Sequence, residues 1–90
     1  MNADETNKGP AAALALAALG WILGDDARAE RLLALTGLTP DGLRARLGDN
    51  IALAAVLGFL EAYEPDLLAC AEAIGMKPAD LIDARRTLES

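Results

Sequence analysis

Residues 49–64 read DNIALAAVLGFLEAYE, and this stretch decides the fold because it is apolar or small on every side. No charge lies between Ile51 and Leu60. Its large apolar residues cannot share one helical face, because neighbours on a helix recur at intervals of three and four residues. We therefore predict a central helix surrounded by other helices and ending near Glu64, where Pro65 follows. The run is too short to cross a bilayer, which needs about 20 apolar residues.

The composition favours further helices packed around that segment. The chain has 90 residues, enough for one domain, and 53% of them are hydrophobic. Most of these are Ala and Leu, whereas aromatic residues make up only 3% of the chain, and this mixture favours helix over sheet. We expect an all-α fold, a compact orthogonal bundle of five to six short helices in a single domain at residues 9–90, after a disordered tail at residues 1–8.

Proline, glycine and capping residues mark where helices begin and end. The predicted helices begin near residues 10, 27, 40, 50, 65 and 78, and the first five end near residues 24, 36, 47, 64 and 75. Gly24 and Gly37 suit left-handed helix ends, and Thr39 and Asp49 suit N-caps. Helical spacing predicts these inner faces, in chain order: Leu14, Ala17, Ala18, Trp21 and Ile22; Ala29, Leu32, Leu33 and Leu35; Leu43 and Leu47; Leu53, Val56, Leu57 and Leu60; Leu67, Cys70, Ala71 and Ile74; Leu81, Ala84 and Leu88.

Two glycines lie inside predicted helices, where Gly costs about 1 kcal/mol relative to Ala. We expect Gly20 and Gly58, together with Ala17 and Ala54, to let the first and central helices approach each other closely.

One pattern occurs twice along the chain. Residues 30–47 and 67–86 both show a helix, a Gly, an apolar residue, a Pro two residues later and an inward Leu three residues after the Pro. The spacing is similar to that of helix-turn-helix proteins. A tight glycine turn followed by a proline helix start explains the same pattern without any role in DNA binding. Neither second helix carries the Asn or Gln that reads adenine edges.

The sequence also resembles a known family. The resemblance is carried by residues 31–49, RLLALTGLTPDGLRARLGD, by the apolar helix after them and by residues 67–81, LLACAEAIGMKPADL. Together these are similar to the short, all-helical bacterial proteins catalogued as domain of unknown function 3572, over nearly everything after the tail. The resemblance implies an all-helical fold and implies no activity, ligand or site residue.

Few residues offer catalytic or metal-binding chemistry. The chain has no His, so the commonest general base and metal ligand are missing. Cys70 is expected to be a buried apolar side chain without a base beside it. We therefore predict no catalytic, cofactor-binding or metal residues, no cofactor, and a protein that is not an enzyme.

Three charged sets, two acidic and one basic, have alternative interpretations. A hard cation could bind at Asp26 with Glu30, or at Glu61 with Glu64 and Asp66, but helix capping and solubility explain both sets. An anion could bind where the second and third helices meet, but salt bridges to nearby acids explain the same basic residues, which are Arg28, Arg31, Arg44 and Arg46.

Charge narrows the classes of partner. The formal charge is −6, from 14 acids and 8 bases, and it opposes attraction to nucleic acid or to anionic membranes.

A single Cys cannot form an intramolecular disulfide, so we expect a cytoplasmic protein. Residues 10–24 could instead be the core of a signal peptide, but Asp4 and Glu5 precede them where a basic leader is expected.

By elimination, the predicted function is that of a small protein-protein interaction module. The alternative is a helix-turn-helix-like DNA-binding regulator. On the last helix the candidate partner contacts are Lys77, Asp80, Asp83, Arg85 and Arg86. Both a monomer and a homodimer remain open.

Overall fold

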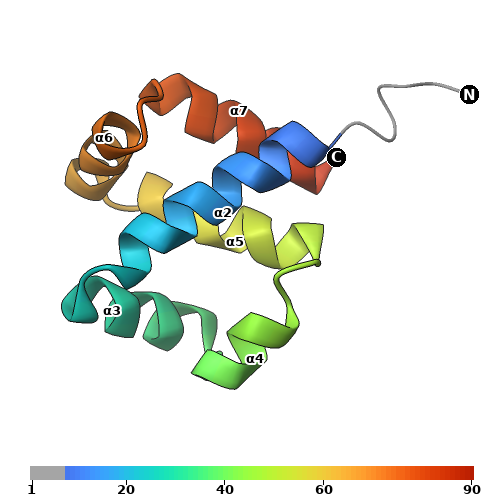
Figure 1. The fold of residues 1–90 in the computed structure, drawn as a ribbon, viewed down its shortest axis with the longest axis vertical. Coiled ribbons are helices and arrows are strands. Elements are labelled where there is room, and N and C mark those ends of the chain that lie inside the picture. The colour runs from blue at the N-terminus through green and yellow to red at the C-terminus, as the bar shows by residue number, and fades with distance from the viewer. Residues whose placement is uncertain (1–7) are drawn as a thin grey trace, which may run out of the picture.

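The computed structural model describes residues 8–90, and these form six α-helices without a strand (Figure 1). The helices are α2 (Gly9–Leu23), α3 (Asp26–Thr36), α4 (Pro40–Ala45), α5 (Asn50–Glu61), α6 (Glu64–Ala73) and α7 (Pro78–Glu89). The predicted all-α bundle is confirmed. Of the predicted tail, only Lys8 belongs to the described residues, where it precedes α2 and its Nζ donates a hydrogen bond to the backbone oxygen of Ser90.

Helices α2 and α5 cross in the middle of the molecule, with α6 and α7 on one side and α3 and α4 on the other (Figure 1). Helix α5 contacts α2, α3, α6 and α7, which makes it the centre of the core. None of the described helices is both long enough and apolar enough to span a bilayer.

The central position of α5 is confirmed by burial. Leu53, Val56, Leu57 and Leu60 are between 0% and 3% exposed. The expectation that the helix is covered on every side is wrong at its outer edge, because Ile51 is 64% exposed. Four neighbouring helices reach most of the circumference of α5 and leave one strip of it open.

Several helix ends follow the sequence signals closely. The Asp49 carboxylate accepts a hydrogen bond from the backbone N–H of Ile51, and the Thr39 hydroxyl accepts one from Gly42. Gly37 and Gly75 have φ angles of 73° and 74°, in the left-handed region that favours glycine. The two copies of the repeated pattern therefore share a left-handed glycine at the end of their first helix.

Other predicted boundaries are wrong. Helix α5 ends at Glu61, three residues before the predicted Glu64, because Ala62 and Tyr63 form a turn and Glu64 already begins α6. Helix α4 ends at Ala45 and not at Leu47. Gly24 has φ −72° and ends α2 without a left-handed residue, since its N–H bonds directly to the carbonyl of Trp21.

The inner face predicted for α2 is rotated from the observed one. Ala15 and Leu19 are buried, while the predicted inner residue Ala17 is exposed and Leu14 and Trp21 lie half-buried at the edge of the core. Helix α2 is apolar almost all the way round, so its spacing defines no single inner face.

The prediction for the second helix is wrong at Leu35, which is 66% exposed. Only Leu32 of α3 is fully buried.

The proposed close approach through the two glycines is also wrong. A Cβ atom added at Gly20 would meet no atom within 4 Å, and one at Gly58 would lie 3.9 Å from Cδ of Arg85. Gly58 therefore faces α7 rather than α2, at an ordinary packing distance.

Replacing Leu57 by Ala should destabilise the fold by about 2 to 5 kcal/mol, because the side chain is 0% exposed and its removal leaves a cavity in the core. Urea unfolding monitored by circular dichroism measures this loss. Leu68→Ala, which changes a leucine of α6 that is 49% exposed, is the matched control and should change stability by less than about 1 kcal/mol. Equal losses in the two variants would contradict the central role of α5.

Candidate functional site

The five residues predicted to contact a partner divide into two groups on α7. Arg85 is held within the molecule: its guanidinium donates to both carboxylate oxygens of Glu61 on α5, and its Nη1 lies 2.6 Å from Oε1 of Glu89. The hydrogen bond with Glu61 raises the pKa of Arg85 further above its ordinary value. This side chain therefore joins α7 to α5 and presents little of itself to a partner.

The other four residues lie at the surface of α7. Asp80 accepts a hydrogen bond of 3.0 Å from the backbone N–H of Lys77, which fixes the first turn of the helix. Asp83 and Arg86 are exposed and form no salt bridge with another described residue. Asp80 and Asp83 therefore form an acidic part of the α7 surface that a partner can reach.

A groove between α2 and α7 joins these carboxylates to an apolar floor. We name it the α2–α7 groove, and its volume is about 590 Å³. Its lining residues are Pro10, Ala11, Ala13, Leu14, Ala17, Ile74, Met76, Asp80, Asp83, Ala84 and Thr87.

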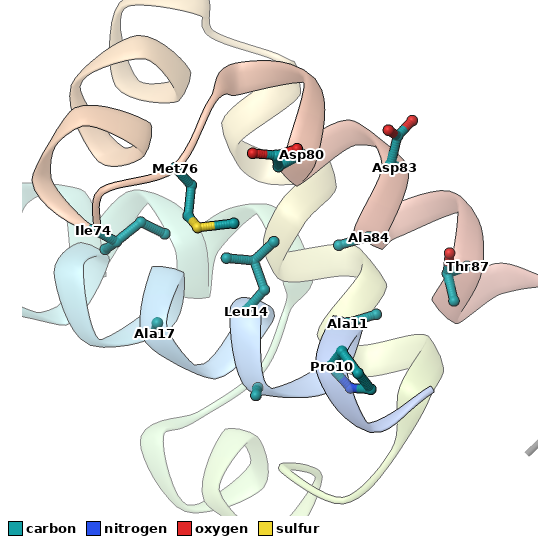
Figure 2. A pocket seen from close by; sticks show the side chains of 11 residues that line it. Pro10, Ala11, Leu14, Ala17, Ile74, Met76, Asp80, Asp83, Ala84 and Thr87 are labelled. Atoms are coloured by element: carbon teal, nitrogen blue, oxygen red, sulfur yellow. The ribbon is translucent and has the colours of Figure 1, made fainter. Parts of the chain in front are cut away.

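Figure 2 shows how the sides of the groove are built. Leu14 extends from α2 toward Met76, which belongs to the turn between α6 and α7. Asp80 and Asp83 lie along the α7 side. No basic residue is among the lining residues, so the groove combines an apolar floor with a negative rim.

Sequence reasoning found the rim of this groove and missed its floor. Leu14 and Ala17 were predicted to face the core, and Met76 was given no role. One signal was available: α2 is apolar on more sides than a single buried face requires, which indicates an apolar surface left at the edge of the core.

The four arginines that were considered as an anion site do not share a common contact. Arg31 binds Asp66 at 2.8 Å and Arg44 binds Asp41 at 2.7 Å, as the salt-bridge interpretation predicts.

The remaining two behave differently. The Arg28 guanidinium stacks over the Trp21 ring, 3.7 Å from its centroid, and Nη2 donates to the Trp21 carbonyl oxygen. Arg46 forms no salt bridge within the described residues. The structure therefore does not gather the four side chains around one anion.

The second acidic set is used in part within the fold. Glu61 binds Arg85 and Asp66 binds Arg31, so two carboxylates of the second set serve as salt-bridge partners. Within residues 8–90, no three acidic or thiol side chains are grouped closely enough to hold a metal ion.

Comparison with known protein families identifies the chain. The sequence model described as "Protein of unknown function (DUF3572)" matches residues 8–90. The chain belongs to this family. The match covers all six described helices, including both sides of the α2–α7 groove. No curated protein and no solved structure matches the chain.

Cys70 lies outside the groove, in the core, where it is 0% exposed. Burial raises the pKa of its thiol from 9.0 to about 11, against a smaller lowering by the charge of Arg28. The thiolate is the nucleophile, so at mild alkaline pH the folded protein holds about 100-fold less of it than an ordinary Cys does.

Cys70 should therefore react slowly with an aromatic disulfide reagent at pH 8 in the folded protein and quickly after unfolding in urea. Because the folded pKa lies above the unfolded one, the fold should also lose stability as the pH rises from 9 to about 11. Cys70→Ala is the control that retains the other alkaline titrations, and its stability should fall less over this range. Rapid reaction in the native protein would contradict the buried position.

Proposed function

We propose that this protein is a non-enzymatic interaction module whose α2–α7 groove binds an amphipathic helix of another protein that carries basic side chains. The supporting observation is the apolar floor bordered by two carboxylates and by no basic residue. An apolar groove that receives the apolar face of a helix is a common mode of peptide recognition.

The two parts of the groove contribute differently to binding. Leu14, Ala17 and Met76 offer apolar surface, whose removal from water supplies most of the affinity. Asp83 forms no salt bridge with another described residue, so it is free to attract a Lys or Arg of the partner. Charges at the rim mainly speed association and select the partner.

The proposal also includes that the protein has no catalytic activity and that it is located in the cytoplasm. Cys70, the one thiol, lies in the core, which suits a role without nucleophilic catalysis and a reducing compartment such as the cytoplasm.

A pair of synthetic helices tests the proposed binding. One peptide combines Leu with Lys at helical spacing, and the other replaces each Lys by Glu. Fluorescence anisotropy at about 0.15 M salt should show binding of the Leu-Lys peptide and not of the Leu-Glu peptide, because only short-range charge contacts survive at a Debye length of about 8 Å. Equal binding of both peptides would contradict the role given to the acidic rim.

Two variants with matched controls locate the bound peptide. Ala17→Arg places a long basic side chain in the groove and should weaken binding by about tenfold or more, whereas Ala69→Arg changes an equally exposed alanine on α6 and should not. Asp83→Asn removes one rim charge and should weaken binding of the peptide. Its control, Glu30→Gln, removes one exposed charge from α3 and should not. A tenfold loss with Ala69→Arg instead of Ala17→Arg would place the peptide elsewhere.

The alternative function, DNA binding by the α6–α7 unit, has less support. The six charges of α7 and its N-cap sum to zero, from the acids Asp80, Asp83 and Glu89 and the bases Lys77, Arg85 and Arg86. Of the bases, Arg85 is already bound to Glu61 and Glu89. A DNA-reading helix needs a positive surround to release counterions from the duplex.

We therefore expect no measurable binding to duplex DNA at physiological salt. Titration of random and genomic duplex, followed by fluorescence anisotropy at about 0.15 M salt, measures this. Submicromolar binding that fell steeply with salt and disappeared when Arg85 and Arg86 were both changed to Ala would favour the regulator.

A further inference from the structure

A second apolar surface lies on α3 and α5, away from the lining of the groove. The three most exposed large apolar side chains of the described residues border it: Leu35 at 66%, Ile51 at 64% and Tyr63 at 51%. On α5, the exposed Ala55 and the largely buried Phe59 line the hollows of this surface. We name these five residues the α3–α5 face.

The face is continuous rather than a set of scattered side chains. Two adjoining hollows, of about 310 and 450 Å³, share Leu35 and Phe59 in their linings. Contiguous apolar surface of this kind marks an interaction site more often than single exposed side chains do.

Small residues make the face suitable for another helix. Ala52 and Ala55 lie along the α5 side of the first hollow, so a second helix can approach the backbone of α5 closely there. At 1.5 Å per residue, the 12 residues of α5 give the face a length of about 18 Å.

Charge lies only at the two ends of the face. Arg46 and Asp49 line the end near the start of α5, and Arg31 lines the other end, over the rings of Phe59 and Tyr63. Arg31 uses Nη2 to bind Asp66 and is still 48% exposed. Its remaining N–H groups are thus able to meet a second carboxylate.

We propose that the α3–α5 face binds the same face of a second copy of this chain, with a two-fold axis passing near Ala55. A two-fold axis perpendicular to α5 at this position runs the two α5 helices antiparallel. The end with Arg46 and Asp49 then meets the end with Arg31 in the other copy, so the Asp49 carboxylate of each copy approaches the Arg31 guanidinium of the other.

The charge pattern is what favours a second copy here. Two copies carry −6 each and repel at long range. The charged lining residues of the α3–α5 face are Arg31, Arg46 and Asp49, which sum to +1, so the interface itself does not bring acids together. The α2–α7 groove cannot pair with itself in this way, because its charged lining residues are both acids.

Sedimentation velocity from about 1 µM to about 1 mM protein tests the dimer. The wild-type chain should shift from the mass of one chain to that of two. Ile51→Lys places a charge near the axis and should raise the dimer Kd by about tenfold or more, whereas Leu68→Lys alters a side chain of similar exposure on α6 and should leave Kd unchanged. Circular dichroism confirms that both variants are folded.

Cross-linking tests the position of the axis. In a Cys70→Ala background, Ala55→Cys should form a disulfide-linked dimer under mild oxidation, because a residue near a two-fold axis lies beside its own copy. Ala69→Cys, an exposed position on α6, is the control and should not.

Three results would overturn the proposal: a monomer at every concentration, a dimer that Ile51→Lys does not weaken, or cross-linking at Ala69 in preference to Ala55. Asp83→Asn should leave the dimer intact, which separates this interface from the peptide-binding groove.

Discussion

The structure depends on covering α5, a helix of 12 residues with six buried apolar side chains and no charge before Glu61. Each of the five larger ones, which are Leu or Val or Phe, stabilises the fold by about 1.5 to 3 kcal/mol relative to exposure. A helix that is apolar on every side needs neighbours on every side, yet this short chain supplies four that reach it. The arrangement buries Leu57 completely and leaves Ile51 open, so the interaction that holds the core together also produces an unpaired surface.

Local chemistry made much of the fold predictable from sequence, and long-range packing made the rest unpredictable. The turns at Gly37 and Gly75 were correct because only glycine adopts a positive φ without strain. The end of α5 was misplaced because Ala62 favours helix by propensity, so no local signal ends the helix before it and the tertiary structure decides. The inner face of α2 was misassigned because its residues are apolar in nearly every direction, and the positions of α5 and α7 select which of them are buried.

The candidate site shows the same division between local and distant information. Asp80 and Asp83 could be selected from sequence as exposed charges of an amphipathic helix. The floor beneath them could not, because Leu14 lies more than sixty residues earlier in the chain and joins the groove only through the packing of α2 against α7. Arg85 was selected for the same reason as Asp83, but its carboxylate partner on α5 is also distant in sequence and removes it from the surface.

The two proposed surfaces differ in charge, and this difference has a consequence for how they work together. The α2–α7 groove is acidic and the α3–α5 face is close to neutral, and for this reason we assign a basic helix to the former and a second copy to the latter in our proposals. Neither occupant competes with the other, because the two linings share no residue. A dimer formed through α5 therefore carries two free grooves. A partner with two basic helices would bind the second groove at the high effective concentration set by the first, so dimerisation increases avidity without any new contact in the groove.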